Sequence, residues 1–294
     1  MNDVGNSVDT EPRERAFEVS GLRFAAQEWG REGERPVLAL HGWLDNSASF
    51  AALAPQLSGI HLVALDMAGH GRSDHRPGSQ PYNIWQDVGE VFGVADQLGW
   101  ESFTLIGHSR GAIVSMLAAG TFPERICDLV LIDGLWPEPV VAEDAPQQLA
   151  RSIRDATALQ HKPPPVYQSR ESIINARYRG RSRLSREAAM LLTDRGMRQE
   201  GDGFTWSTDP HLMGASAFKL TQDHIQAFIN RIAAKTLLIL AKEGLPRLFD
   251  QYQEILAMFP HIHVEKLSGS HHLHMEAQSP QVAALIRRHC GLSE

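Results

Sequence analysis

The stretch Phe103-Thr104-Leu105-Ile106-Gly107-His108-Ser109-Arg110-Gly111 decides the fold. Its first four residues form an apolar run that is too short for a helix and is typical of a buried strand. The pattern G-x-S-x-G follows at once, and the apolar, helix-length segment Arg110–Thr121 comes next. This order of strand, sharp turn and helix predicts a strained backbone at Ser109, with a glycine two residues away on each side to avoid a clash. We therefore expect the Ser109 hydroxyl to be a nucleophile above the carboxyl end of a sheet.

Seven further runs predict strands of the same sheet: Ala16–Ser20, Leu22–Trp29, Pro36–Leu40, Ile60–Leu65, Ile126–Ile132, Thr236–Leu240 and Ile262–Leu267. Helix-length segments lie between many of them: Ser47–Leu57, Ile84–Leu98, Arg110–Thr121, Leu248–Met258 and Val282–Arg288. Alternating strands and helices predict an α/β protein with an open, doubly wound, mostly parallel sheet of eight strands.

The alternation stops after Asp133 and resumes near Lys235. The amphipathic stretches Ser169–Tyr178 and Ser185–Gly196 predict a mostly helical cap inserted at residues 137–214. The core is then formed by residues 15–136 and 215–294, after a disordered tail at 1–14. From Arg151 to Arg186 the cap carries nine basic and two acidic residues. This basic segment either is a solvated helical face or favours an anionic substrate.

Composition excludes several classes of protein. The 294 residues are 43% hydrophobic and 21% charged, as in globular proteins, and the net charge of −7 argues against nucleic-acid binding. No apolar stretch approaches the length of about 18 residues that marks a membrane span. Residues 1–12 lack the basic and apolar regions of a secretory signal, and Cys127 and Cys290 are too far apart in sequence to suggest a disulfide framework. We expect a cytoplasmic protein, whose oligomeric state the sequence leaves open.

An oxyanion hole is expected beside Ser109. The segment His41-Gly42-Trp43 ends the predicted strand Pro36–Leu40, and a loop in this position supplies one backbone amide in such folds. The other amide comes from the residue after the nucleophile. We therefore expect the amides of Trp43 and Arg110 to stabilise the oxyanion.

The base is sought late in the chain, in Gly269-Ser270-His271-His272-Leu273-His274-Met275-Glu276. A histidine in this loop can reach Ser109; His271 is the first candidate and His272 the alternative. The pattern HHxH also suggests a metal site, but no cluster of Asp, Glu or Cys elsewhere in the sequence completes one. We therefore expect neither a metal nor a cofactor.

These motifs resemble the α/β-hydrolase fold and, within it, the serine hydrolase-like family. The matching stretches are His41-Gly42-Trp43-Leu44-Asp45-Asn46, Asp66-Met67-Ala68-Gly69-His70-Gly71-Arg72-Ser73, the Ser109 turn and the His271 loop. The resemblance implies a serine nucleophile, unlike the aspartate of haloalkane dehalogenases and epoxide hydrolases. It places the family's histidine on His271, with Glu276 on the acidic residue five positions later.

The acid of the triad departs from the family pattern. The usual aspartate follows the strand at Thr236–Leu240, but this sequence has Gly244 there. Asp133, at the end of the strand Ile126–Ile132, is the first substitute and Glu243 the alternative. Either can orient the histidine if the geometry survives. A third possibility is that neither serves, and that activity is weak.

The leading hypothesis is a serine hydrolase of carboxylic esters or thioesters that forms an acyl-enzyme on Ser109. Its partner would be a small acyl substrate, either neutral or anionic. A second hypothesis is a carbon–carbon bond hydrolase of dicarbonyl acids, in which Arg110 holds the substrate carboxylate. A third is a non-catalytic binding protein on a hydrolase fold, which the missing acid would favour. Arg110 can also simply pair with a nearby acid.

Overall fold

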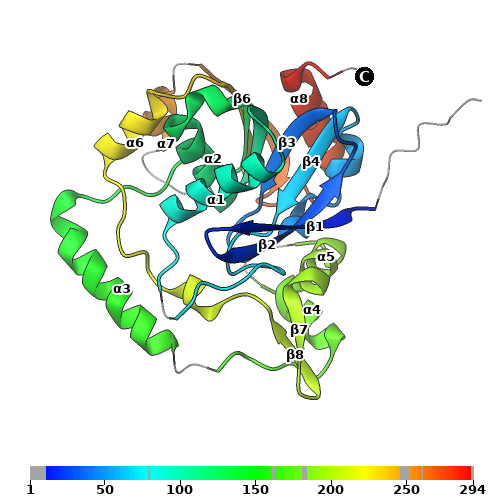
Figure 1. The fold of residues 1–294 in the computed structure, drawn as a ribbon, viewed down its shortest axis with the longest axis vertical. Coiled ribbons are helices and arrows are strands. Elements are labelled where there is room, and N and C mark those ends of the chain that lie inside the picture. The colour runs from blue at the N-terminus through cyan, green and yellow to red at the C-terminus, as the bar shows by residue number, and fades with distance from the viewer. Residues whose placement is uncertain are drawn as a thin grey trace, which may run out of the picture.

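The fold is an eight-stranded sheet with helices on both faces (Figure 1). The computed structural model describes residues 11–78, 80–160, 163–180, 184–245, 252–259 and 261–292. The sheet order is β1-β2-β4-β3-β5-β6-β9-β10. The six strands β4, β3, β5, β6, β9 and β10 are parallel, whereas β2 pairs antiparallel with both of its neighbours, β1 and β4. The prediction of an eight-stranded, mostly parallel sheet is confirmed. The strands are β1 (Arg13–Val19), β2 (Leu22–Trp29), β3 (Arg35–Leu40), β4 (Ile60–Leu65), β5 (Phe103–His108), β6 (Ile126–Ile132), β9 (Lys235–Glu243) and β10 (Ile262–Ser270).

The core lies on both faces of this sheet. One cluster joins the sheet to α1 (Ile84–Gln97) and α2 (Arg110–Thr121) through side chains such as Val91 and Met116. The other joins the sheet to α8 (Ser279–Cys290) through Ile286. Strands β4 and β5 are buried along their whole length because helices cover both of their faces, which explains their continuous apolar sequences. The helices of this part are α1 (Ile84–Gln97), α2 (Arg110–Thr121), α6 (Gln222–Ile229), α7 (Tyr252–Ala257) and α8 (Ser279–Cys290).

Three sequence predictions need correction or restriction. Strand β1 begins at Arg13, so residues 13 and 14 do not belong to a tail, and Glu14 pairs with Arg195 at 2.7 Å; residues 1–10 lie outside the described residues. The segment Ser47–Leu57 forms two short 3₁₀ turns at Ser47–Phe50 and Ala54–Gln56, because Pro55 has no amide to continue a longer helix. Of the expected helix at 248–258, residues 248–251 lie outside the described part.

Among its described residues, the segment predicted as a cap, residues 137–214, contains three α-helices: α3 (Ala145–Leu159), α4 (Arg170–Tyr178) and α5 (Arg186–Gly196). It also contains a hairpin that the sequence did not predict, formed by β7 (Met197–Glu200) and β8 (Gly203–Trp206). The hairpin turns at Gly201, whose φ of 57° favours glycine. Lys162, Arg181 and Arg183 of the basic segment lie outside the described residues.

Two parts of this segment differ in their attachment to the core. Helix α3 projects away from the sheet, whereas α4 and α5 lie together near β1 and β2 (Figure 1). Buried polar contacts fasten α5: Arg195 Nε donates to Asp66 at 2.9 Å, and Asn46 donates to the Leu192 carbonyl at 2.8 Å. Within the described residues, none of the helices is both long and apolar enough to cross a membrane.

Candidate active site

Ser109 occupies a strained turn between β5 and α2. Its φ of 52° and ψ of −114° lie outside the regions that a serine ordinarily adopts. A Cβ on Gly107 would lie 2.4 Å from the Gly111 carbonyl oxygen, and a Cβ on Gly111 would lie 2.1 Å from that of Leu40. The two glycines of the motif are therefore required by close backbone packing, which lets the turn present the Ser109 hydroxyl at the carboxyl end of the sheet.

The two amides expected for an oxyanion hole belong to the loop after β3 and to the start of α2. The Arg110 amide belongs to the first turn of α2, where backbone N–H groups have no partner within the helix. Within the described part of the chain, neither this amide nor that of Trp43 has a hydrogen-bond acceptor. The Trp43 indole Nε1 donates to the Leu212 carbonyl at 3.1 Å, which fastens the loop after β3 to the segment that follows β8.

His271 and Asp133 lie together at the same sheet edge. The His271 ring donates from Nδ1 to Asp133 Oδ2 over 2.6 Å. The buried Asp133 carboxylate also accepts hydrogen bonds from the backbone amides of Ala241, at 2.9 Å, and Leu245, at 3.1 Å. Within the described residues, the ring of His271 forms no hydrogen bond with the Ser109 hydroxyl; such bonds tighten when substrate binds.

The two alternative residues are placed differently. Glu243 is exposed at the end of β9, whereas a Cβ on Gly244 would lie 2.1 Å from Asp133 Oδ2. The Asp133 carboxylate therefore fills the space beside the turn where the family's usual acid is attached. His272 is buried and its Nε2 lies 3.1 Å from Asp45 Oδ2, so this ring engages another carboxylate.

Asp45 and His108 were not assigned a role from the sequence. His108 directly precedes Ser109, and its Nδ1 lies 3.6 Å from Asp45 Oδ2, while Arg177 pairs with Asp45 Oδ1. The only signal in the sequence was that Asp45 falls in the motif at 41–46 and His108 in the motif at 107–111. Nothing in the spacing showed that both would meet His272.

These three side chains offer possible metal ligands. The donor atoms of Asp45, His108 and His272 lie within 4.8 Å of one another, and imidazole with carboxylate is a donor set that zinc accepts. The Arg177 guanidinium already neutralises the carboxylate. A divalent cation would place a second positive charge on the same buried group, so we assign an ion pair here and not a metal centre.

Burial controls the protonation of this cluster. Burial and the neighbouring His271 ring lower the pKa of His108 to about 4, so its ring is neutral at pH 7. Burial alone would raise the pKa of Asp45, but His272, His108 and Arg177 outweigh it and hold that pKa well below its usual range. Asp45 is therefore a permanent buried anion next to a neutral imidazole.

Arg110 is engaged by an acid of its own protein. Its guanidinium pairs with Asp87 at 2.6 Å, and Asp87 is buried in the first turn of α1. A buried carboxylate needs this counter-charge. Of the two roles that the sequence left open for Arg110, pairing with a nearby acid is the one that the structure contains.

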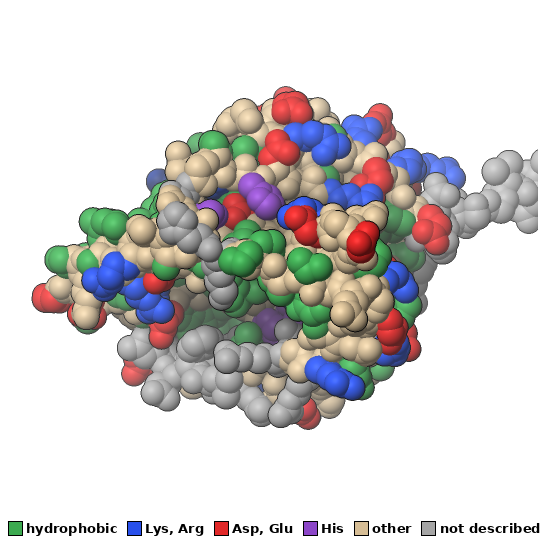
Figure 2. Space-filling model, turned by 90° about the horizontal axis from the view of Figure 1, so that it is seen from below, with side chains coloured by type: hydrophobic (Ala, Val, Ile, Leu, Met, Phe, Trp, Pro, Cys, Tyr) green, Lys and Arg blue, Asp and Glu red, His purple; other side chains and the backbone are tan. Residues whose placement is uncertain are grey.

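Two neighbouring cavities adjoin the Ser109 turn. The first, of about 130 Å³, is lined by Ser109, Asp133, Trp136 and Leu245 among others. The second, of about 730 Å³, is lined by Trp43, Tyr82, Ile84, Trp85, Arg110, Pro137, Glu138, Gln148, Arg151, Leu212, Met213, Gly214, Ala215, Ser216, Phe218, Lys219 and Leu220. Both include Glu138, so they are adjacent. Figure 2 shows hydrophobic side chains around a hollow on one face of the molecule.

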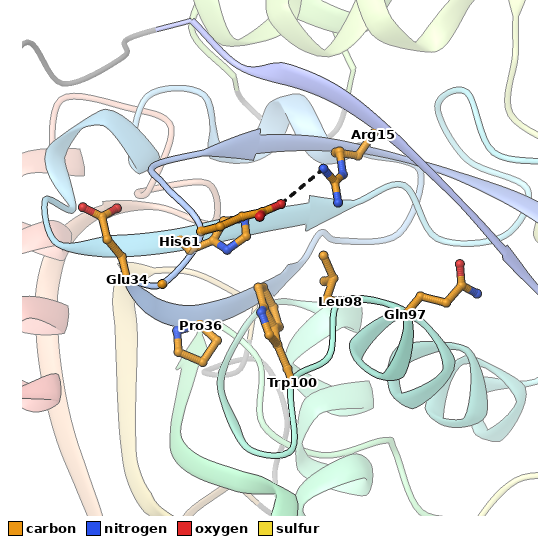
Figure 3. A pocket seen from close by; sticks show the side chains of 9 residues that line it. Arg15, Glu34, Pro36, His61, Gln97, Leu98 and Trp100 are labelled. Carbon is orange, nitrogen blue, oxygen red and sulfur yellow. Dashed lines mark ion pairs between the residues drawn. The ribbon is translucent and has the colours of Figure 1, made fainter.

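A further cavity, of about 330 Å³, lies at the opposite edge of the sheet, where β3 and β4 begin (Figure 3). Its His61 ring bonds to Glu28 at 2.6 Å and meets the Trp100 ring edge-on. Ligands of open α/β sheets bind at the carboxyl ends of the strands. The Ser109 edge is therefore the better candidate for the active site.

Comparisons with known proteins agree with this architecture. A family model described as alpha/beta hydrolase fold matches residues 35–278. A serine hydrolase-like protein of Dictyostelium discoideum is 30% identical over 283 residues, which cover 88% of this chain and 76% of that protein. Serine hydrolase-like protein 2 of Homo sapiens is 32% identical over 229 residues, covering 75% and 72%. The crystal structure of a hypothetical protein from Pseudomonas aeruginosa PAO1 is 42% identical, covers 95% of this chain and 99% of its own, and has a TM-score of 0.90.

The chain therefore belongs to the α/β-hydrolase-fold family. Within that family it resembles the serine hydrolase-like proteins, as the sequence motifs indicated. This membership supports a hydrolase activity.

Proposed function

We propose that this protein is a serine hydrolase of carboxylic esters or thioesters. The observation that carries the proposal is the 2.6 Å hydrogen bond between His271 and Asp133 at the sheet edge that also presents Ser109. In the proposed triad, Ser109 is the nucleophile, His271 the base and Asp133 the acid, each from a different loop. The presence of a buried acid removes the main support for a non-catalytic protein.

In the proposed reaction, Ser109 Oγ attacks the substrate carbonyl and its proton moves to His271 Nε2. Asp133 keeps the proton of Nδ1 in place and stabilises the imidazolium. The oxyanion would be held by the amides of Trp43 and Arg110, each worth about 2.7–4 kcal/mol by analogy with measured donors. His271 then protonates the leaving group, and water, activated by the same ring, hydrolyses the acyl-enzyme.

The larger cavity supports an apolar, uncharged acyl group as the substrate part that it binds. Trp43 is 47% exposed and Phe218 50% exposed, and Trp85 meets Phe218 edge-to-face with ring centroids 6.4 Å apart. Exposed aromatic side chains around one cavity are typical of apolar ligand sites.

The cations along this cavity already face acids. Arg110 pairs with Asp87 at 2.6 Å, Lys219 lies 3.5 Å from Glu138, and Arg151 lies 3.8 Å from its helix neighbour Asp155. This pairing disfavours the alternative of a dicarbonyl acid whose carboxylate is held by Arg110. It also argues against the anionic substrate preference that the basic segment suggested.

A fluorophosphonate probe tests the proposed function. The wild-type protein should be labelled at Ser109 and should hydrolyse short nitrophenyl esters. Ser109→Ala should lose the label and leave only the residual turnover of the oxyanion hole and binding. Ser270→Ala is the matched control, because it removes another hydroxyl from the same edge of the sheet. Undiminished turnover in Ser109→Ala would end the assignment.

A further inference from the structure

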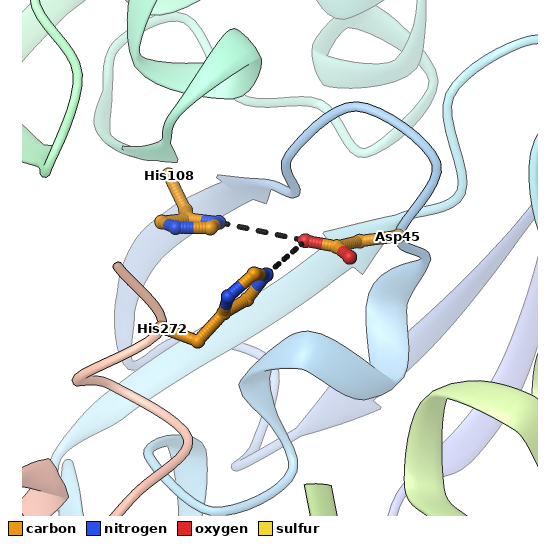
Figure 4. Close-up of side chains that lie close together, drawn as sticks. All are labelled: Asp45, His108 and His272. Carbon is orange, nitrogen blue, oxygen red and sulfur yellow. Dashed lines mark hydrogen bonds and ion pairs between the residues drawn. The ribbon is translucent and has the colours of Figure 1, made fainter. Parts of the chain in front are cut away.

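A buried carboxylate lies where the loops that carry Trp43, Ser109 and His271 come together. Asp45, 2% exposed, belongs to the loop that carries Trp43. Its Oδ2 accepts a hydrogen bond from His272 at 3.1 Å and lies 3.6 Å from His108 Nδ1 (Figure 4). A Cβ on Gly42 would lie 2.8 Å from Asp45 Oδ2 and 2.9 Å from His108 Nδ1, so the contact needs a glycine in this loop.

The two histidines are the chain neighbours of the proposed catalytic residues. His108 directly precedes Ser109, and His272 directly follows His271. In addition, His108 Nε2 donates to the backbone oxygen of His271 at 3.0 Å. Asp45 therefore restrains the base loop through its hydrogen bond to His272, and the bond from His108 to the His271 backbone joins that loop to the nucleophile turn.

The counter-charge of Asp45 comes from the cap. Arg177, on α4, pairs with Asp45 Oδ1. His108 does not supply this charge, because burial keeps its ring neutral, and His272 bonds to the other carboxylate oxygen, Oδ2. A buried carboxylate without a paired charge is strongly disfavoured. The Arg177 guanidinium, whose charge does not depend on protonation at neutral pH, is available to Asp45 only while α4 is seated against the core.

We propose that Asp45 is a positioning residue of the active site and that the Arg177–Asp45 ion pair is a latch that aligns the Ser109 and His271 loops when α4 is docked. This inference rests on the proposed function for its catalytic consequence. The latch makes the cap a part of the catalytic apparatus and not only a wall of the substrate cavity.

A broken latch should reduce turnover of every substrate. Without Arg177, the Asp45 carboxylate turns toward water or takes up a proton, and both changes weaken its hydrogen bond to His272 and so loosen the base loop. A misplacement of about 1 Å at the reacting groups can cost about 10²-fold in rate. A cap that only shaped the acyl cavity would instead affect the binding of long substrates.

The test compares two arginines of the same helix. Arg177→Met removes the latch, and Arg170→Met is the matched control, because Arg170 is exposed and pairs within the cap with Asp194 at 2.6 Å. We expect Arg177→Met to lower kcat for nitrophenyl acetate and for a longer nitrophenyl ester by about 10- to 100-fold, with little change in KM. Arg177→Lys should recover much of kcat, and Arg170→Met should match the wild type. A loss confined to the KM of the longer ester, or equal behaviour of the two Met variants, would overturn the proposal.

A second measurement does not depend on turnover. The His271 Nδ1 proton, held in the 2.6 Å bond to Asp133, should give a far-downfield proton NMR signal. Arg177→Met should shift or broaden this signal, and Arg170→Met should not. If the wild type neither hydrolyses esters nor takes the fluorophosphonate label, the proposed function fails, while this signal still decides whether the latch positions His271. An unchanged signal in Arg177→Met would refute the latch.

Folding of the variant is controlled by removing both charges. The double variant Arg177→Met/Asp45→Asn leaves no unpaired buried carboxylate, so it should fold even if Arg177→Met alone does not. It should show the same loss of kcat and the same change in the downfield signal. Full turnover in this folded double variant would contradict the proposal.

Discussion

Replacing Asp133 by asparagine tests the proposed triad at its least familiar member. The carboxylate receives the His271 ring and the Leu245 amide on Oδ2 and the Ala241 amide on Oδ1, at 2.6, 3.1 and 2.9 Å. All three partners donate, so an ionised carboxylate with two accepting oxygens suits the site. Asparagine has one accepting oxygen, and its amide nitrogen must face at least one of these donors.

Two arrangements of the asparagine are possible, and both are unfavourable. If its nitrogen faces the Ala241 amide, two donors oppose each other, which costs about 1–3 kcal/mol of stability for an unsatisfied buried group. If its nitrogen faces His271, the ring must adopt the tautomer with the proton on Nε2. That tautomer cannot take the proton of Ser109, and loss of the acid in this way lowers kcat by about 10⁴-fold in the serine-protease template. A factor of 10⁴ corresponds to about 5.5 kcal/mol of transition-state stabilisation.

The assay is steady-state hydrolysis of a short neutral nitrophenyl ester, with thermal unfolding to show that the variant is folded. Glu243→Gln is the control, since Glu243 is exposed at the end of β9 and should cost far less. The residual rate of Asp133→Asn should rise with pH as hydroxide replaces the general base. If Asp133→Asn retained both the wild-type stability and more than about a tenth of kcat, or if Glu243→Gln lost as much activity, the reasoning from the template would be refuted.

Two further predictions concern the substrate and the effect of acid. Lengthening a neutral acyl chain should lower KM by up to about fourfold per buried CH₂, whereas a terminal carboxylate on the chain should raise KM; equal KM values across the series would refute an apolar acyl cavity. The free energy of unfolding should fall as the pH drops from about 6.5 to 5. The reason is that some histidines are kept neutral by burial in the folded state but are protonated in the unfolded chain. Each such histidine lowers the free energy of unfolding by up to about 1.4 kcal/mol per pH unit. The buried histidines with lowered pKa values are His41, His70, His108 and His274. Glu90 has the opposite effect and offsets the contribution of one histidine. Burial and Asp87 raise its pKa to about 7, so in this pH range Glu90 binds a proton in the folded state but not in the unfolded chain. Urea unfolding at both pH values checks the sign, and a stability that rose at pH 5 would contradict it.

The sheet was predictable because each central strand carries its own signal. Strands such as Ile60–Leu65 are apolar throughout, since both of their faces are covered. Elements that depend on their surroundings were predicted less well. The hairpin at 197–206 consists of two four-residue strands that are only partly buried, so its sequence lacks a strong apolar pattern. Pro55 interrupts the segment after β3, where apolar spacing alone suggested one helix.

The residues of the candidate site also differ in how well the sequence predicts them. Ser109 was predictable because the elbow is a local structure whose glycines, strand and helix are contiguous in sequence. The meeting of Asp45 with His272 and Arg177 was not, because these residues are 227 and 132 positions away from it along the chain. Contacts of this kind arise only when the loops after β3 and β10 and the helix α4 converge. Neither the period of hydrophobic residues nor a motif reports that convergence.

Gly244 shows how a local sequence pattern is explained by a contact between neighbouring strands of the fold. From the sequence, a glycine in the acid's usual turn left three possibilities: Asp133 as the acid, Glu243 as the acid, or neither, with weak activity. In the fold, β6 and β9 are parallel neighbours that end at the same edge, with Ile132 paired to Ile239, so an acid after either strand can reach the His271 loop. With Asp133 in its present position, a Cβ on Gly244 would lie 2.1 Å from the carboxylate, so a larger residue at 244 would require the Asp133 side chain to move. The Asp133 carboxylate, held where it bonds to His271, therefore fits a glycine at position 244. The glycine that left the acid unassigned in the sequence is, in the fold, the residue that leaves room for the Asp133 carboxylate of the proposed triad. The two residues should be considered together when this part of a related sequence is interpreted.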